Sequence, residues 1–195
     1  SVQRVETVPP DLYNESEVVG LKAARVGRWR HVDVVVVSVG AYYYGHRLHR
    51  MPRTDWDQSI QDNLITHFNL QRTFIDLLRK QGRGVYIALV GPEADSILPD
   101  EGVMSIMAAA QKMMARVSAQ EAFDSQIRVY ALTSHTSIQT RSRGKNVNPD
   151  WITAGDLGDY VTALADGKLS TMYETMHDLR GRAHVEALLE RARTG

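Results

Sequence analysis

Residues 32–40 read VDVVVVSVG, a nearly continuous run of valines that ends at a glycine. Strands of parallel sheets are buried on both faces, so their sequences run apolar residue after apolar residue instead of alternating. We therefore expect residues 32–39 to form a strand inside a parallel sheet that helices cover on both sides.

Further strands and helices are predicted in alternation around this run. Strands are expected over residues 2–8, 85–90, 127–133 and 169–176, and helices over 14–26, 54–80, 103–123, 153–165 and 184–193. Asn14 and Thr153 are each followed three residues later by an acidic side chain, the spacing of a helix-capping box. The expected buried stripes are Val19, Ala23 and Val26 in the first helix, and Ile60, Leu64, Phe68, Ile75 and Leu78 in the second. This order predicts one α/β domain, residues 1–195, with a parallel sheet of about five strands flanked by helices.

Composition narrows the function classes. The chain carries 23 basic and 23 acidic side chains, so no net charge attracts it to nucleic acid or to an anionic membrane. It contains no cysteine, which excludes disulfides, thiolate catalysis and thiolate metal sites. No apolar stretch is long enough to cross a bilayer. We expect a cytoplasmic protein that binds neither nucleic acid nor membrane.

Four segments match, in order and spacing, the landmarks of the short-chain dehydrogenase/reductase (SDR) family. They are DVVVVSVG (33–40), TDWDQSIQDNL (54–64), GVYIALVG (84–91) and IRVYAL (127–132), and residues 151–167 are similar to the family's late helix. The chain resembles this family from about residue 5 to residue 176. The resemblance implies a Rossmann-like sheet, a catalytic tetrad of Asn, Ser, Tyr and Lys, and a nicotinamide cofactor.

The resemblance places the tetrad at Asn63, Gly91, Met104 and Ala108. Asn63 keeps the family's side chain, and we expect it to have a structural role in the backbone of its helix. Gly91 has no hydroxyl, Met104 has no proton to donate, and Ala108 cannot lower a neighbouring pKa. No Tyr-x-x-x-Lys motif occurs in the chain. The resemblance is therefore to a catalytically degenerate member, with no catalytic residues of its own.

The resemblance also bears on the cofactor. In the family, a glycine-rich turn after the first strand holds the cofactor's pyrophosphate at a helix N-terminus. These 195 residues begin where the family's third strand lies, and they contain no G-x-G-x-x-G. We expect a truncated domain without the N-terminal nucleotide-binding βαβ unit and without a cofactor of its own, although an active partner subunit could bind NAD(P). A gap of two strands would leave buried backbone groups unpaired, so residues 2–8 are predicted to pair directly beside residues 32–39.

The helix over residues 103–123 is apolar on more than one face, which is typical of an interface. In the family, this helix and the preceding long helix pair with their copies in another subunit. The resemblance implies a homologous SDR subunit as the partner, in a hetero- or homo-oligomer. The expected interface residues are Val103, Met107, Ala110, Met114, Val117, Phe68 and Ile75.

The loop over residues 40–53, GAYYYGHRLHRMPR, is a second candidate contact surface. Arginine offers two-pronged hydrogen bonds to acidic groups and tyrosine offers stacking. The loop could hold a phosphate-bearing or acyl-CoA ligand, meet an acidic partner, or be a solvated loop whose tyrosines pack on the sheet edge. The candidate residues are Tyr42, Tyr43, Tyr44, His46, Arg47 and Arg50.

The seven histidines are scattered along the chain and predict no metal site. His46 and His49 lack a carboxylate at ligand spacing, and His135 and His177 stand alone in the sequence.

Two functions follow from these patterns. The first is a non-catalytic SDR-like subunit, similar to the inactive chains of hetero-oligomeric SDR dehydrogenases, that supports an active partner. The second is a repurposed SDR fold, acting as a lyase, an isomerase or a binder of a small acyl-CoA-like ligand without nicotinamide, with Asn63, Tyr42, Tyr43, Tyr44 and His135 lining the old cleft.

Overall fold

The computed structural model describes residues 5–194 except 98, 146 and 170–173. Its helices are α1 (Glu15–Trp29), α2 (Arg53–Ser59), α3 (Thr66–Gln81), α4 (Gly102–Glu121), α5 (Ala154–Ala165) and α6 (Arg182–Thr194). Its strands are β1 (Val34–Val37), β2 (Gly84–Val90), β3 (Ile127–Ser134), β4 (Ile138–Gln139), β5 (Ile152–Thr153) and β6 (Met176–Leu179). Three short 3₁₀ turns (Leu48–Arg50, Pro92–Ala94 and Arg141–Arg143) and one π-helical turn (Ile60–Ile65) complete the described elements.

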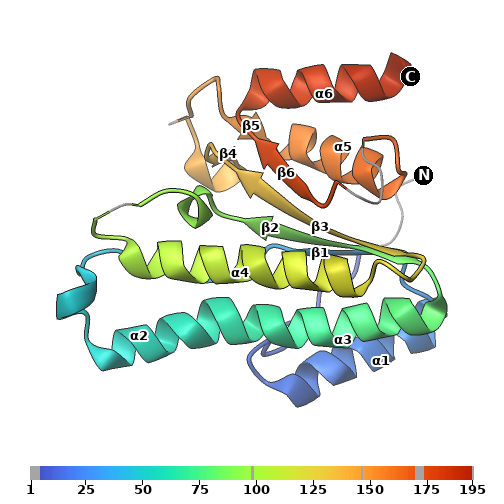
Figure 1. Ribbon diagram of the computed structural model, residues 1–195, viewed down its shortest axis with the longest axis horizontal. Coiled ribbons are helices and arrows are strands. Elements are labelled where there is room, and N and C mark those ends of the chain that lie inside the picture. The colour runs from blue at the N-terminus through green and yellow to red at the C-terminus, as the bar shows by residue number, and fades with distance from the viewer. Residues whose placement is uncertain (1–4, 98, 146, 170–173, 195) are drawn as a thin grey trace.

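The principal sheet has four parallel strands in the order β1-β2-β3-β6, and β4 and β5 form a separate parallel pair. Helices α1, α3 and α4 cover one face of the sheet, and α5 and α6 cover the other (Figure 1). Each face has its own apolar cluster, one around Phe74 and Ala115 and one around Tyr130 and Leu164. The α/β class with a Rossmann-like parallel sheet is thus confirmed, and the principal sheet has four strands.

The strand predicted over residues 2–8 does not form over residues 5–8, and residues 1–4 lie outside the described part of the chain. The carboxylate of Glu6 lies 2.7 Å from Arg25 and 2.7 Å from Arg28, so ion pairs tie this segment to α1 instead of to the sheet. Within the described residues, β1 therefore pairs with β2 alone. Val34 and Val36 remain 39% and 44% exposed, so the expected burial on both faces is wrong for this strand.

Helix starts agree with the predictions better than helix faces do. The side chain of Asn14 accepts a hydrogen bond from the Ser16 N–H at the start of α1, and Thr153 forms a complete capping box with Asp156. In α1 the buried residue is Val18, so the stripe of Val19, Ala23 and Val26 is wrong; Val19 and Ala23 are exposed.

The long helix predicted over residues 54–80 consists of α2, the π turn and α3. A π turn accommodates an extra residue and so rotates every later side chain around the helix axis. As a result His67, Leu70 and Phe74 face the core together with Leu78 of the expected stripe, whereas Phe68 of that stripe is half exposed and Ile75 is only partly buried against the core.

The last strand lies later than predicted. Strand β6 begins at Met176, where the predicted strand over residues 169–176 was expected to end, and residues 170–173 lie outside the described chain. Its register pairs Leu132 with His177 and Thr133 with Asp178. No described helix is both long and apolar enough to cross a membrane.

Candidate functional site

The four tetrad positions come together around one cleft. Asn63 from the π turn, Gly91 from the end of β2, and Met104 and Ala108 from α4 line a cavity of about 250 Å³. The cavity lies where the carboxyl ends of β1 and β2 meet the first half of α4, the edge at which open parallel sheets bind ligands. Its lining also includes Tyr42, Glu93 and Gln111.

Asn63 is buried, and both ends of its side-chain amide form hydrogen bonds with the backbone around it. Its amide nitrogen donates to the carbonyl oxygens of Ala41 (3.0 Å) and Ser59 (3.1 Å), and its amide oxygen accepts from the Ala41 N–H (3.1 Å). Gln111 donates to the backbone carbonyl of Asn63 at 2.9 Å. These contacts fasten the loop after β1 and helix α4 to the π turn.

Gly91 differs from the family's serine in two ways: it lacks the hydroxyl, and the space beside it is occupied. A Cβ built on it would collide with the carboxylate of Glu93. The space in which a serine side chain would begin is therefore filled by a carboxylate, two residues further along the chain. Neither the thioether of Met104 nor the methyl group of Ala108 supplies a proton to the cleft.

One phenol does line the cleft, that of Tyr42. A hydrogen bond with Glu101, assisted by partial burial and by the charges of Glu101 and Glu93, raises the pKa of Tyr42 to about 12. A general acid or base works best with a pKa near the working pH, and this shift moves the phenol away from it.

Several polar side chains of the candidate loop over residues 40–53 already have partners within this chain. The Tyr43 hydroxyl donates to Asp55 at 2.8 Å and lies 2.7 Å from His46 Nδ1. Arg47 lies 3.8 Å from Asp100. Tyr42, Tyr44 and Arg50 are exposed. The loop is thus anchored to α2, and its role in contacting a ligand or partner stays a prediction.

A second cavity of about 360 Å³ adjoins the cleft and shares Ser38, Leu89 and Gly91 with it. It lies between the ends of β2 and β3 and the side of α5, and Ser134 and Thr136 are among its polar lining residues. None of its described lining residues is charged, so this cavity supplies no counter-charge for a phosphate.

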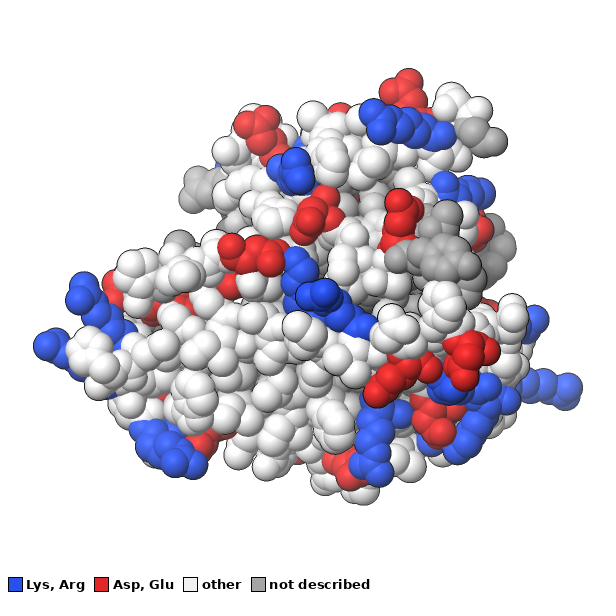
Figure 2. Space-filling view, in the orientation of Figure 1, with Lys and Arg blue, Asp and Glu red and all other residues white. Residues whose placement is uncertain are grey.

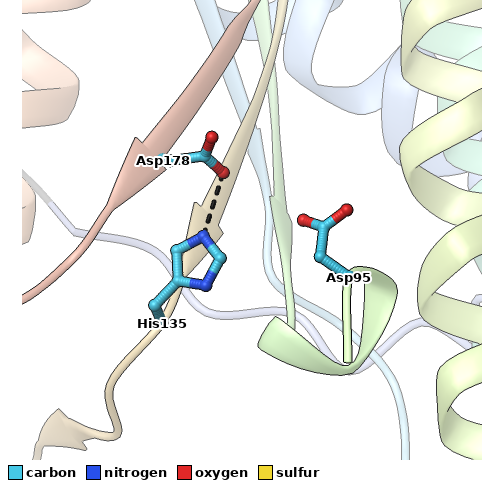
Figure 3. Close-up of side chains that lie close together, drawn as sticks. All are labelled: Asp95, His135 and Asp178. Carbon is cyan, nitrogen blue, oxygen red and sulfur yellow. Dashed lines mark hydrogen bonds and ion pairs between the residues drawn. The ribbon is translucent and has the colours of Figure 1, made fainter. Parts of the chain in front are cut away.

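A cluster of charged side chains lies close to these cavities, and the sequence analysis did not find it (Figure 3). His135 Nε2, directly after β3, is 3.0 Å from Asp178 Oδ1 on β6. Asp95, after β2, faces the pair, and one potential ligand atom from each of the three residues lies within 4.8 Å of the others. Lys112 Nζ on α4 lies 2.5 Å from Asp95 and 3.9 Å from Asp178.

Neither histidine that stands alone in the sequence is alone in the fold. Donation from His135, together with the charge of Lys112, lowers the pKa of Asp178. His177 Nδ1 lies 2.9 Å from the Tyr160 hydroxyl, and burial lowers the pKa of His177. Asp178 lies on the last strand, β6, which the sequence pattern had placed at residues 169–176. A strand predicted at its actual position would have brought Asp178 beside His135.

Comparison with known proteins identifies the family. A family model described as enoyl-(acyl carrier protein) reductase matches residues 2–171. The chain belongs to the SDR family. No curated protein sequence matches it.

Solved SDR structures share the fold at low sequence identity. A metagenomic short-chain oxidoreductase in complex with NADP is 20% identical, with a TM-score of 0.73, and the match covers 91% of this chain and 73% of that one. The enoyl-[acyl-carrier-protein] reductase (NADH) from Aquifex aeolicus VF5 is 19% identical, with a TM-score of 0.69, and the match covers 87% of this chain and 70% of that one. ElxO with NADP bound is 16% identical, with a TM-score of 0.65, and the match covers 94% of this chain and 66% of that one. This chain therefore spans about two thirds of the length of ElxO.

The SDR chain also has an apolar groove of about 650 Å³ between α3 and α4. Five of the seven predicted interface residues line it: Phe68, Ile75, Ala110, Met114 and Val117. The other two, Val103 and Met107, are only 1% and 2% exposed and pack in the core of this chain. We therefore remove them from the expected interface. Met113, which the sequence analysis did not choose, lines the groove and is half exposed.

Proposed function

We propose that this chain is a non-catalytic SDR subunit that assembles through α3 and α4 with a homologous SDR subunit. The partner is an active dehydrogenase or a second copy, and this chain supports its structure. The observation that carries the proposal is the exposed apolar face formed by these two helices.

Large apolar side chains remain exposed along that face. Phe68, Met113 and Val117 are 50%, 52% and 48% exposed, and Phe123 at the end of α4 is 50% exposed. Figure 2 shows the surface over the middle of the two helices free of charged side chains, with lysine, arginine and acidic residues at its margins. A contiguous apolar patch with a charged rim is typical of a protein interface.

The cleft supports the non-catalytic part of the proposal. Hydride transfer to or from a carbonyl needs a proton donor beside the reacting oxygen, and the tetrad positions offer a glycine, a methionine and an alanine. The carboxylate of Glu93 beside Gly91 occupies the space in which the family's serine side chain would begin. The residues present do not fit a nicotinamide cofactor bound by this chain alone.

The experiment compares the isolated chain with the chain co-expressed beside an active SDR from the same genome. We expect a copurifying assembly whose mass equals that of two or more subunits, and no binding of NADPH or NADH to the isolated chain in fluorescence titrations. Micromolar binding of either cofactor by the isolated chain, or its turnover of a carbonyl substrate, would refute the proposal.

The continuity of the two cavities favours one alternative, a repurposed lyase or isomerase, or a binder of a small acyl-CoA-like ligand whose acyl group would enter the cleft while its phosphates stay outside it. Together they form a cleft that is apolar along β2 and carries the Glu93 carboxylate at one end. If this function is correct, acyl-CoA binds the isolated chain and Glu93→Gln changes its affinity, whereas Glu186→Gln on the exposed side of α6 does not. Under the subunit proposal neither variant matters.

A further inference from the structure

We propose that Asp95, His135 and Asp178 form a binding site for a divalent first-row transition-metal ion, which exchanges with the ammonium group of Lys112. This site is separate from the tetrad cleft and from the α3–α4 groove. The inference does not depend on the proposed function.

The three side chains converge from separate elements at one edge of the sheet. Asp95 follows the turn after β2, His135 follows β3, and Asp178 lies on β6, so three parallel strands deliver them to their carboxyl ends (Figure 3). Figure 3 shows the Asp178 carboxylate above the imidazole ring of His135, joined to it by a dashed line, and the Asp95 carboxylate to the right of both.

The distances fit a metal ion with little movement. Zinc binds histidine nitrogen and carboxylate oxygen at about 2.0–2.2 Å in tetrahedral geometry, so two of its ligands lie about 3.4 Å apart. His135 Nε2 and Asp178 Oδ1 are 3.0 Å apart. The largest separation in the cluster is no more than 4.8 Å, which rotation of the exposed Asp95 side chain can reduce by about 1 Å.

The cluster already holds one cationic group. Two carboxylates face the single ammonium group of Lys112, which lies 2.5 Å from Asp95 and 3.9 Å from Asp178. A dication would balance both carboxylates, and the long stem of Lys112 allows its ammonium group to turn into solvent.

The donor set determines the class of metal. Imidazole nitrogen favours Zn²⁺ and Co²⁺ over Mg²⁺, Ca²⁺ and Mn²⁺, which prefer oxygen ligands. The metal replaces the proton on His135 Nε2, and that proton moves to Nδ1 or to solvent. Because the chain has no cysteine, only histidines and carboxylates compete for the metal.

The test is calorimetric titration of the full chain with ZnCl₂, together with the visible absorption of added Co²⁺. We compare the wild type with His135→Ala, Asp178→Asn and Lys112→Met; His49→Ala, an exposed histidine on another loop, is the control. We expect one site whose affinity falls at least about tenfold in His135→Ala and Asp178→Asn and is unchanged in His49→Ala. In Lys112→Met it rises about tenfold, because a competing positive charge is removed.

Circular dichroism checks that each variant is folded, and Lys112→Met provides a result that does not depend on losing a ligand. Equal zinc affinity in the wild type and His135→Ala would overturn the proposal. The proposal would also be overturned if Lys112→Met bound zinc no more tightly than the wild type. The absence of a Co²⁺ absorption band in both the wild type and Lys112→Met would overturn it as well.

Discussion

Replacing Val117 by aspartate tests the interface directly. Val117 lines the groove between α3 and α4 and is 48% exposed in this chain, so about half of its side chain remains for a partner to cover. Full burial of a valine side chain contributes about 1.5 kcal/mol, and half of that is about 0.7 kcal/mol for each copy in the interface. The substitution removes this contribution.

The aspartate also introduces a carboxylate into an apolar surface. Burying an unpaired carboxylate costs several kcal/mol, so the total loss is at least about 3 kcal/mol even if the pair relaxes around it. A loss of this size raises the dissociation constant at least about 100-fold. In the isolated chain position 117 faces solvent, and the melting temperature should change by no more than about 2 °C.

Sedimentation velocity over a dilution series measures the dissociation constant. Ile97→Asp is the matched control, because Ile97 is 89% exposed and does not line the groove. We expect Val117→Asp to dissociate at concentrations where the wild type and Ile97→Asp remain assembled. If Val117→Asp assembles with a dissociation constant within threefold of the wild-type value, the interface is elsewhere.

Three further predictions concern the stability of the chain. The Tyr86 hydroxyl is buried and has no hydrogen-bond partner among the described residues, so Tyr86→Phe should raise the free energy of unfolding in urea by about 1 kcal/mol; a decrease would contradict this. Gly91→Ser should keep the melting temperature within about 2 °C of the wild-type value, because its Cβ meets only the tip of the flexible Glu93 side chain, which can turn away; a larger loss would show that Glu93 is held in place. Burial lowers the pKa of His67, so its neutral form stabilises the fold above the ordinary histidine pKa of about 6.5, and this contribution is lost as the pH falls below that value. Burial also lowers the pKa of His177, so the effect of His67 must be separated by comparing the wild type with His67→Gln. We expect the urea midpoint to fall less between pH 7.5 and pH 5.5 in His67→Gln than in the wild type. An equal fall in the two proteins would refute the assignment.

The sequence was sufficient for the elements whose determinants are local. A valine run, two capping residues, and a glycine with φ +73° at the end of α3 are short-range signals, and the helices and central strands follow them. The order of these elements then limits the topology to a few parallel arrangements. The four tetrad positions lie around one cleft because each follows or faces the end of a strand in that topology.

The errors arose where long-range contacts decide the outcome. The π turn changes the phase of α3, and no periodic pattern reveals it, so Phe68 was assigned to a buried stripe although it is half exposed. The segment after Val5 binds α1 through Glu6, an ion pair between residues about twenty positions apart. The His135–Asp178 pair spans 43 positions and depends on the register of β3 with β6.

The outer edge of β1 has a consequence for handling the protein. Among the residues that the structure describes, no strand pairs with this edge, so its backbone amides and carbonyls, beside the partly exposed Val34 and Val36, offer an extended peptide a template for pairing. Pairing of two such edges from separate molecules would be slow to reverse and would grow with concentration. Solutions of the purified chain should therefore lose monodispersity on storage, and lysine substitution at Val36 should extend their useful lifetime.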